Sequence, residues 1–314
     1  MIIDGIQVLS ISVKNMEESL AFFQDWIGME LLDKQSVDSY SLNKIWNLPE
    51  CPDAHVVYLK KKQQPTIIAL CEFKSLSRKP IREKGRLWDY GLYNIAFSVK
   101  DIDSIYRDLT ARGFEFIAPP VTYKPRWVPF SVKEAILIGP GEMPIAHIEL
   151  LRSQQPDFDG RYGRIMDSAQ VVESMEEAIS FYRDVLGLEL VGDHQLPRGL
   201  VDEVLGLPQG TDLRMAFLNS PGSTAPLVEL IEFSRKGVPL DDEARPPNLG
   251  LFMLSMETDD LPALIKNFRN NNILLVSEPV ALEHVACGAI EAVRVLGPGK
   301  VMLEFFQKAS RKPC

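Results

Sequence analysis

SMEEAISFYRDVLGLEL, at Ser174–Leu190, is a near copy of NMEESLAFFQDWIGMEL, at Asn15–Leu31, which lies 159 residues earlier. Both stretches begin with a helix-capping residue followed three positions later by Glu, the capping-box pattern of a helix N-terminus. An apolar stripe at helical spacing follows in the first copy, and Gly28 ends it. A repeat of this length indicates a duplicated unit rather than a solenoid.

The residues around the first copy predict strands on both sides of the helix. QVLSISV at 7–13 alternates in polarity, as a half-buried strand does, and Met29–Gln35 follows the helix as a second strand. Apolar segments at His55–Lys60 and Thr66–Phe73 predict two more strands. The unit is therefore a strand, a helix and three strands.

The same order of elements recurs three more times along the chain. GLYNIAFSVKDID at 91–103 matches GLFMLSMETDDLP at 250–262, and a Gly-Pro-Gly turn at 139–141 matches another at 297–299. These turns are hairpin chemistry rather than phosphate loops, because no helix follows them. The sequence predicts four βαβββ modules, at about 5–73, 91–151, 164–233 and 249–307.

Four such modules predict an α+β fold with two domains. One helix covers only one face of its sheet, so two modules that pair their open faces would enclose a cupped cavity. A polar segment with Pro and Gly, at 152–163, is the best linker candidate. We therefore expect modules one and two to form a domain at 1–155, modules three and four to form another at 156–314, and each domain to hold a cupped mixed β-sheet.

Composition and charge narrow the range of partners. The 314 residues are 46% apolar and 25% charged, and the net charge is −9, which argues against a general nucleic-acid or anionic-membrane surface. No apolar run approaches the roughly 20 residues that span a bilayer, and the first residues show no secretory signal. The four cysteines are scattered, which favours free thiols in a reducing compartment and predicts a cytoplasmic protein.

The module pattern, with FYRDVLGLEL after a capped helix, resembles the vicinal oxygen chelate superfamily over nearly the whole chain. That family includes glyoxalase I, extradiol ring-cleaving dioxygenases, bleomycin- and fosfomycin-resistance proteins and methylmalonyl-CoA epimerase. The resemblance implies a metal site in each cup, with ligands from the first and last strands of each module. Because the superfamily hosts many chemistries, the resemblance specifies the fold better than the activity.

Counting back from the helix caps assigns the ligand positions that the resemblance implies. The first-strand positions fall on Val8, Asn94, Asp167 and Met253. The last-strand positions fall on Ala69, Glu149, Glu229 and Glu304. In the N-terminal cup, a metal would depend on Asn94, His147 and Glu149, since a strand places the last two on one face. The alternative is that His147 is a hydrogen-bonded core histidine.

The C-terminal cup is the preferred site, because Asp167, Glu229 and Glu304 would meet there. Three carboxylates without an imidazole suit a hard cation such as Mg²⁺ or Mn²⁺. Without a metal, crowded carboxyls would raise at least one pKa and supply a general acid or base. The alternative is that some of them face away or pair with Arg214 or Arg294. The polar residues Ser168 and Gln170 leave the register of this strand open.

The last module also resembles, in part, the signature of the ring-cleaving dioxygenases, which use Fe(II). The frame is His284, Arg294, the Gly-Pro-Gly turn at 297–299 and Glu304, but Arg294 stands where that signature has Tyr, and the two His metal ligands are missing. Arg294 would instead receive an anionic group or pair with an acid, and His284 would carry a proton.

We therefore expect a glyoxalase-like or dioxygenase-like enzyme that acts on a small oxygenated molecule, aromatic ones included, by lyase or isomerase chemistry. Glu304, His284 and Arg294 are the expected catalytic residues, and Asp167, Glu229 and Glu304 the expected ligands of Mg, Mn or Fe, or a metal-free acid–base set. Two alternatives are a non-catalytic binding protein like the bleomycin-resistance proteins and a divergent ring-cleaving dioxygenase. The partner is a small molecule, not nucleic acid or membrane, and the sequence leaves homo-oligomers open.

Overall fold

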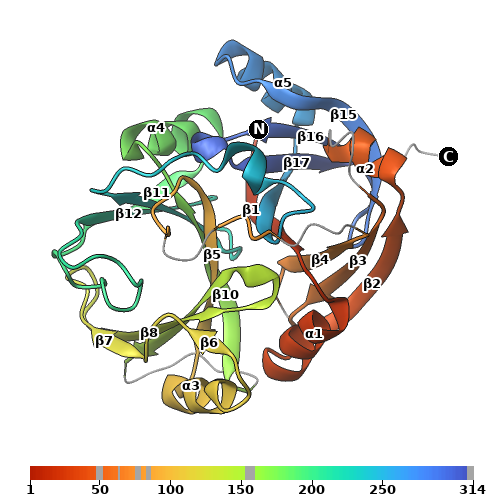
Figure 1. Ribbon diagram of the computed structural model, residues 1–314. Helices are drawn as coiled ribbons and strands as arrows, with labels where there is room; N and C mark the ends of the chain where they lie inside the picture. Colours follow the sequence, from red (N-terminus) through yellow and green to blue (C-terminus); the bar gives the residue numbers. More distant parts are fainter. Residues whose placement is uncertain (47–51, 63, 75–78, 83–85, 153–159, 310–314) are drawn as a thin grey trace.

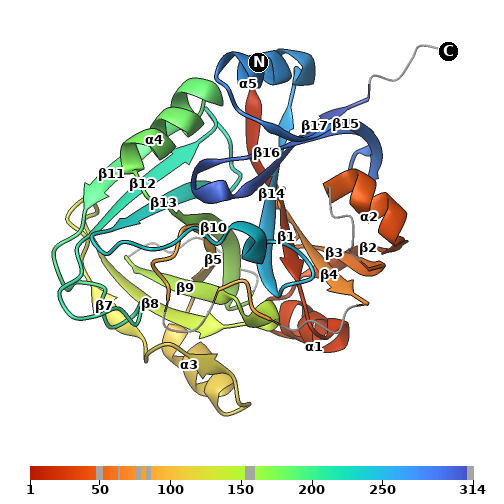
Figure 2. The same cartoon turned by 45° about the horizontal axis from the view of Figure 1, so that its top comes forward.

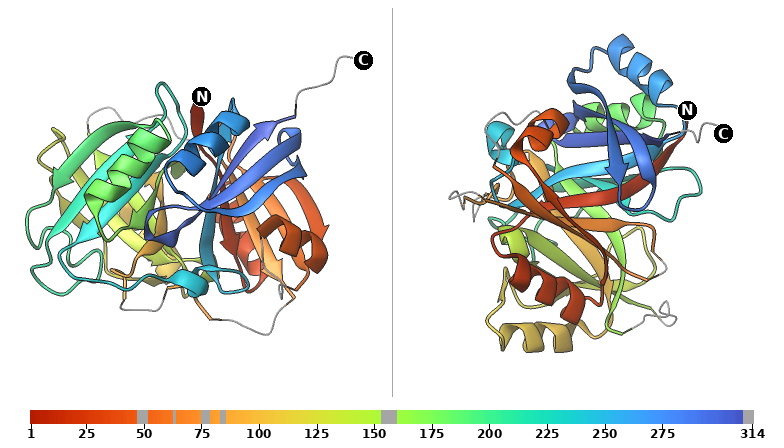
Figure 3. Two further views of the ribbon diagram at one scale, coloured as in Figure 1. Left: turned by 90° about the horizontal axis from the view of Figure 1, so that it is seen from above. Right: turned by 90° about the vertical axis from the view of Figure 1, so that its right-hand side faces the viewer.

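The computed structural model describes residues 1–46, 52–62, 64–74, 79–82, 86–152 and 160–309. Two curled mixed β-sheets lie side by side and carry most of these residues (Figure 1, Figure 3). Most of the predicted linker, residues 153–159, lies outside the described part of the chain. In the described part, no helix has the length and apolar character that a membrane span requires.

The first sheet has eight strands, which come from the first and fourth modules. They are β1 (Ile3–Ser12), β2 (Glu30–Val37), β3 (Ala54–Lys60), β4 (Ile67–Phe73), β14 (Gly250–Thr258), β15 (Leu275–His284), β16 (Gly288–Leu296) and β17 (Met302–Lys308). Their order in the sheet is β15, β16, β17, β14, β1, β4, β3 and β2. The two modules therefore meet where β1 pairs antiparallel with β14.

The second sheet has nine strands, which come from the second and third modules. They are β5 (Gly91–Val99), β6 (Glu115–Phe116), β7 (Val121–Tyr123), β8 (Ser131–Ile138), β9 (Pro144–Leu151), β10 (Tyr162–Val171), β11 (Glu189–Gln195), β12 (Leu213–Asn219) and β13 (Leu227–Phe233). The order is β11, β12, β13, β10, β5, β9, β8 and β6, and β7 pairs with β8. Here the modules meet where β5 pairs antiparallel with β10.

The four modules and the α+β class are as predicted, but the predicted pairing of modules within each half is wrong. Module one pairs with module four, and module two with module three. The modules also join edge to edge rather than face to face. The physical reason is that the first strand of a module has an open edge, and an antiparallel partner strand satisfies its backbone groups. Each joined sheet then curls, and its concave face forms the cup (Figure 2).

The duplicated stretch forms a helix with the same irregularity in both copies. Asn15 accepts a hydrogen bond from the Glu18 amide at 3.2 Å, and Ser174 accepts one from the Glu177 amide at 3.3 Å, so the predicted caps are present. Each helix then widens into a π-helical turn. The segments are α1 (Met16–Leu20) with η1 (Ala21–Trp26), and α4 (Met175–Ser180) with η3 (Phe181–Val185). The apolar stripe had predicted an ordinary helix throughout.

Helices α3 (Ile102–Thr110) and α5 (Leu261–Asn270) occupy the equivalent places in modules two and four. With α1 and α4, they bury their apolar faces against the convex sides of the two sheets in one large core. Residues of all four modules contribute to this core, which excludes water from the helix-facing side of every central strand.

Two insert segments, one after β2 and one after β11, cover the concave faces of the sheets. In the first sheet, α2 (Ser39–Trp46) lies against β15 and buries Leu42 and Trp46, although the sequence had not predicted a helix there. In the second sheet, the loop at 196–207 buries apolar side chains against the cup. Each insert therefore narrows a cavity that the curled sheet leaves open.

Each of the two Gly-Pro-Gly turns joins two strands of its own sheet and packs against the other sheet. They form the short 3₁₀ turns η2 (Pro140–Glu142) and η5 (Pro298–Lys300). A Cβ on Gly141 would come within 2.6 Å of the Ser12 carbonyl oxygen, so only glycine allows this approach. At the other turn, the Gln170 side-chain amide donates to the Pro298 carbonyl at 2.7 Å. Both turns are hairpin chemistry, as predicted, and they also fix how the sheets pack.

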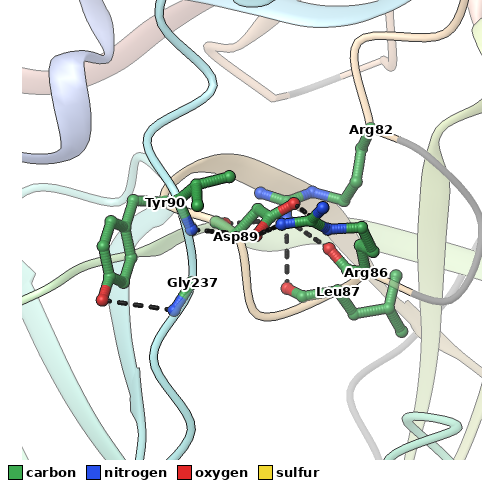
Figure 4. Close-up of polar contacts among 7 residues, drawn as sticks. Arg82, Arg86, Leu87, Asp89, Tyr90 and Gly237 are labelled. Atoms are coloured by element: carbon green, nitrogen blue, oxygen red, sulfur yellow. Dashed lines mark hydrogen bonds and ion pairs between the residues drawn. The ribbon is translucent and has the colours of Figure 1, made fainter.

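A buried arginine organises the connection that enters β5. The guanidinium of Arg82 donates to the carbonyl oxygens of Leu87 and Asp89 at 3.0 and 2.8 Å, and three further loop and strand carbonyls complete its shell. The same connection meets the segment before β14, because the Gly237 amide donates to the Tyr90 hydroxyl at 3.2 Å (Figure 4). The 3₁₀ turn η4 (Asp241–Ala244) follows in that segment.

Candidate functional site

Each curled sheet encloses one cavity on its concave face. The acidic cavity, in the sheet of modules two and three, has a volume of about 360 Å³ and is lined by the carboxyl groups of Asp167, Glu229 and Glu134. The arginine cavity, in the sheet of modules one and four, has a volume of about 280 Å³ and is lined by Arg294, Glu304 and His284. Both volumes are in or near the range of small-molecule sites.

Asp167 and Glu229 form a carboxyl pair in the acidic cavity. Asp167 comes from β10 and Glu229 from the parallel neighbour β13, where Glu229 is opposite Ala169. Residues two apart on a strand share a face, so Asp167 and Glu229 project into the cup together. Their carboxyl groups are close enough for each to shift the pKa of the other, and both are buried. The register that the sequence left open is therefore the one that points Asp167 into the cup.

Ser168 and Gln170, the polar residues of β10 that left its register open in the sequence, have hydrogen-bond partners on the face opposite the cup. Ser168 donates to the Asn94 carbonyl oxygen at 3.1 Å, and Gln170 accepts a hydrogen bond from the Tyr182 hydroxyl at 2.7 Å. Both are fully buried on the helix side of the strand. Internal hydrogen bonds thus offset their desolvation, which is why polar residues occur on that face.

Burial changes the protonation of the pair. It raises the pKa of Asp167 to about 7, and it raises the pKa of Glu229 well above the usual value for glutamate. The charge of Glu134 raises the pKa of both groups further. Because two neighbouring buried carboxyls resist carrying two charges, we expect one member of the pair to be protonated near neutral pH while the other titrates.

The opposite wall of the acidic cavity carries a second acid that the sequence analysis did not identify. Glu134, on β8, accepts a hydrogen bond from the Tyr123 hydroxyl at 2.6 Å, and burial raises the pKa of this carboxyl too. Asn94, on β5, lines the floor between the two walls. Glu134 lies at none of the first-strand or last-strand positions that the family resemblance implies, so the sequence analysis did not single it out.

The rim of the acidic cavity is aromatic. The rings of Trp127 and His194 are stacked, with 4.2 Å between their centroids and an interplanar angle of 3°. Trp127 and His194 both line the cavity, and His194 is partly buried at this rim. The other walls are mainly apolar and aromatic and include Tyr93, Ile148 and Met166. A ligand here would bury an apolar body against them and meet polar groups only at the floor and Glu134.

The arginine cavity has a neutralised floor. The Arg294 guanidinium, from β16, forms an ion pair with the Glu304 carboxylate on the neighbouring strand β17, and the Ser255 hydroxyl donates to Glu304 at 2.8 Å. Arg294 is fully buried. The alternative predicted for Arg294, an ion pair with an acid, is therefore what the structure shows. Since the two charges compensate each other, this floor has little net charge to offer a ligand.

His284 ends β15 and lies at the wall of the same cavity, not on a separate loop. Its ring stacks on Phe306 at 4.9 Å, and its Nδ1 accepts a hydrogen bond from the Ala286 amide at 3.2 Å. Burial lowers the pKa of His284, so the neutral ring is favoured near neutral pH. Among the described residues, its buried Nε2 has no hydrogen-bond partner.

The predicted site of three carboxylates does not form. Asp167 and Glu229 line the acidic cavity, and Glu304 lines the arginine cavity in the other sheet. The cause is the pairing of modules: the third and fourth modules, which supply these acids, belong to different sheets. Glu304, Arg294 and His284 do share one space, but Asp167 and Glu229 are absent from its lining.

The predicted N-terminal group also separates. Asn94 lines the acidic cavity, but His147 is buried on the helix side, where its Nε2 bonds to the Tyr162 hydroxyl at 2.8 Å. Glu149 caps α3, since its carboxylate accepts hydrogen bonds from the amides of Asp101 and Ile102 at 3.0 and 3.1 Å. The alternative predicted for His147, a hydrogen-bonded core histidine, is therefore correct.

The error at Glu149 is one of register. Ser255 pairs with Glu304 between β14 and β17, and the equivalent pair between β5 and β9 is Ala96 with Ala146. The position in module two that corresponds to Glu304 is therefore Ala146. Glu149 corresponds instead to Gln307, which accepts a hydrogen bond from the Leu261 amide at the start of α5.

The described side chains do not match a metal site. No group of three or more His, Cys, Asp or Glu residues in the described ranges is arranged to hold a metal ion. In the acidic cavity, burial favours the protonated forms of Asp167 and Glu229, and Glu134 accepts a hydrogen bond from Tyr123. Mg²⁺, Mn²⁺ and Fe²⁺ need several deprotonated donors that converge on one point, which these carboxyls do not supply.

Comparison with known families agrees with this fold. The family model of the Glyoxalase/Bleomycin resistance protein/Dioxygenase superfamily matches residues 5–126 and 163–305. The chain belongs to this superfamily, in a two-sheet form with duplicated halves. A comparison with curated proteins finds no match.

Solved structures with the same fold include two enzymes or candidate enzymes. Glyoxalase I from Zea mays aligns with a TM-score of 0.66 at 13% identity, over 97% of this chain and 92% of that chain. A putative dioxygenase from Bacillus subtilis aligns with a TM-score of 0.61 at 12% identity, over 98% of this chain and 86% of that chain. At such low identity, these likenesses establish the shared fold and leave the chemistry to the site itself.

Proposed function

We propose that this protein is an enzyme that transfers protons on a small oxygenated organic molecule, as an isomerase or lyase, in the acidic cavity. The observation that carries the proposal is the pair of buried carboxyls of Asp167 and Glu229 in one cavity, where burial raises both pKa values, that of Asp167 to about 7. A general acid–base group works best when its pKa is near the working pH. Paired carboxyls whose environments separate their pKa values are suited to opposite roles.

In this scheme the two carboxyls act in concert. The ionised Asp167 accepts a proton from a carbon next to a substrate carbonyl, and the protonated Glu229 donates its proton to the carbonyl oxygen. The product of this half-reaction is an enol. In an isomerisation, Asp167 gives its proton to another carbon while Glu229 takes back the enol proton. In an elimination, Glu229 takes back the enol proton as the bond to a neighbouring leaving group breaks, and Asp167 protonates that group. Asn94, beside the pair, would orient the substrate oxygen.

The arginine cavity is the weaker candidate for this chemistry. Arg294 and Glu304 already neutralise each other, and neither is a free acid or base in that arrangement. His284 favours its neutral form and is the one group there that could accept a proton. We propose that Glu304, Arg294 and His284 act as ligand contacts rather than as the main catalytic set.

A non-catalytic binding protein is the second candidate. The observation in its favour is the largely apolar and aromatic wall of the acidic cavity, which would hold an organic molecule without any chemistry. Ring cleavage by Fe(II) has less support, because the first-strand positions hold Val8, Asn94, Asp167 and Met253 in place of the histidine ligands that such sites use.

A turnover screen tests the proposal. Diketones, hydroxy ketones, hydroxy acids and catechols are incubated with the protein, with and without added Mg²⁺, Mn²⁺, Fe²⁺ or Zn²⁺ after elemental analysis. We expect turnover of at least one carbonyl compound, and we expect Asp167→Asn and Glu229→Gln to lower kcat by about 100-fold or more. The exposed Glu189→Gln is the matched control and should keep full activity. Tight binding without turnover would favour the second candidate, and turnover that survives both substitutions would contradict the assigned roles.

A further inference from the structure

The lining of the acidic cavity is one-sided in charge. Three carboxyl groups line it, from Asp167, Glu229 and Glu134, and its described lining residues include no lysine or arginine. The nearest cation that acts on Asp167 is the exposed Arg164, on the same strand. A carboxylate or phosphate ligand would therefore enter a space with no partner for its charge, and the acids would repel it.

Buried polar atoms in this cavity lack partners. Among the described residues, two acceptors, Asp167 Oδ1 and Asn94 Oδ1, and the Tyr93 hydroxyl have no hydrogen-bond partner, and all three side chains are more than nine-tenths buried. Buried polar atoms are normally satisfied by the protein, by water or by a ligand. Two unsatisfied acceptors on one floor call for a ligand that brings several donors. An ammonium group brings three.

The walls suit the remainder of such a ligand. The aromatic residues Tyr93, Tyr123 and Trp127 line the cavity, and a cation that reaches a free ring face gains from the ring quadrupole. Aliphatic side chains fill the rest of the lining. The volume of about 360 Å³ accommodates a molecule of drug-like or smaller size.

We propose that the acidic cavity binds a small organic amine in its protonated form, with the ammonium group among Asp167, Asn94 and Glu134 and an apolar or aromatic body against the walls. This inference rests on the proposed function for the location of the site and adds the class of substrate. The ammonium group supplies hydrogen-bond donors to the unpartnered acceptors on the floor. Its positive charge is the counter-charge that the three carboxyl groups lack within the described lining.

The proposal predicts how affinity depends on pH. The ionisable groups around Asp167 are Glu229, Glu134, Arg164, the neutral phenols of Tyr93 and Tyr123, and His194 at the rim. A cation binds the ionised form of the pair more tightly, so binding an amine should release protons, and the affinity should rise as the pH rises from 6 to 8. A neutral ligand of the same shape should show no such rise.

Matched ligand series on the whole protein test this inference by calorimetry. The probes are benzylamine and 2-phenylethylamine, the corresponding alcohols, and benzoate and phenylacetate, each at pH 6 and pH 8. We expect at least one amine to bind at least about tenfold more tightly than its alcohol at pH 8, more weakly at pH 6, and the carboxylates not to bind. Asp167→Asn and Glu134→Gln should each weaken the amine about tenfold or more, while Glu189→Gln should not.

Several outcomes would overturn the inference. They are alcohols that bind as tightly as amines at both pH values, preferred binding of a carboxylate, no binding by any amine at 10 mM, or thermal stabilisation by Mg²⁺ or Mn²⁺ with no response to amines. The ligand series needs no variant, so a misfolded variant does not affect it. Amine binding without any turnover would instead sink the proposed function alone, and Asp167-dependent turnover of neutral carbonyl compounds without amine binding would sink the inference alone.

Discussion

Burial sets the charge state of the residues that matter most in this molecule. Asp167 and Glu229 are held toward their protonated forms, and His147 is held neutral with a pKa of about 4. In each case the main cause is desolvation, which disfavours the charged form. The acids face a cavity where a ligand can reach them, whereas His147 is sealed in the core. Desolvation therefore makes the two acids candidates for proton transfer, and it makes His147 a residue that destabilises the protein when the pH falls.

His147 should make the protein less stable in mild acid. Its folded pKa of about 4 is below the unfolded value of about 6.5, so below pH 6.5 the unfolded chain takes up a proton that the folded chain refuses. Stability from this group is present above pH 6.5 and is lost as the pH falls toward 4. Between pH 7 and 4.5 the loss should be about 2 kcal/mol.

The paired substitution His147→Phe with Tyr162→Phe removes both hydrogen-bonding partners and copies Phe305, the equivalent residue of the fourth module. Urea unfolding at pH 7 and 4.5 should show that this variant loses about 2 kcal/mol less than the parent over that range. An equal loss in both proteins would show that His147 is not the group responsible.

Asp167 should make the protein less stable as the pH rises, which is the opposite of the effect of His147. Its pKa is raised to about 7 from an unfolded value near 3.8, so the folded chain holds a proton that the unfolded chain releases, and stability falls as the pH rises through this window. Asp167→Asn cannot ionise. Its stability relative to the parent should therefore grow by about 2 kcal/mol from pH 5 to pH 8. A pH-independent difference in urea unfolding would mean that Asp167 titrates normally.

At this scale the sequence located some residues and missed others for identifiable reasons. Asp167 was placed in a cup by counting back from a helix cap, which works because its strand leads directly into the capped helix, and Glu229 was placed there as the last-strand position that the family resemblance implies. Glu149 was misplaced, because a position near the end of a strand gives no register by itself. Glu134 was missed, because its partner Tyr123 is on a strand whose pairing is not encoded locally.

Connections between elements, rather than the elements themselves, hold the two sheets in place. The loop before β5 is built around Arg82, which is buried and bonded to five carbonyl oxygens. Burial lowers its pKa to about 10, so the guanidinium stays charged at neutral pH. Removing the side chain would take a hydrogen-bond donor away from each of these carbonyls, and unsatisfied buried acceptors are costly.

Arg82→Met should therefore destabilise the protein by about 3–5 kcal/mol, although it keeps the volume of the side chain. Arg183→Met is the matched control, since Arg183 is exposed and pairs only with its neighbour Asp184; its effect should stay below about 0.5 kcal/mol. Thermal or urea unfolding measures both. If Arg82→Met unfolds with the same midpoint as the control, the carbonyl shell does not carry the stability assigned to it.

Helices and strands were predictable from the sequence where one hydrophobic period dominates a segment. The capped helices and the alternating strands were found from 3.6- and two-residue patterns. The helix α2 was not, because its short, mixed sequence gives no clear period, and its stability comes from packing Leu42 and Trp46 against the first sheet. The π turns in η1 and η3 were also missed, since one inserted residue barely changes the apolar stripe.

At the scale of the molecule, the order of modules in sequence is not their order in space. Each sheet takes one module from each half of the chain, and this arrangement places Asp167 and Glu229 in one cavity with Glu134 and Asn94. Local sequence could not reveal it, because all four modules offer the same kind of open edge at the first strand. The choice of partner depends on packing between distant segments, such as the Gly-Pro-Gly turns against the other sheet.

The interleaved pairing predicts that neither half folds alone. A fragment of residues 1–155 would contain β1 and β5 without their partners β14 and β10, and so would expose two long strand edges. We expect each half, 1–155 and 156–314, to be unfolded or aggregated by circular dichroism, and the two to assemble into a folded complex when co-expressed. A monomeric half with a cooperative melt would contradict the pairing.

The central claim is that Asp167 and Glu229 hold one shared proton near neutral pH. Infrared difference spectra of the parent protein and of Asp167→Asn, recorded from pH 4 to 9, observe the carboxylic acid C=O band directly. The account predicts a protonated carboxyl band that persists at pH 6, declines with a midpoint near 7 in the parent protein, and lacks this transition in Asp167→Asn. If all carboxyl bands disappear by pH 5, both acids ionise normally and the account is wrong.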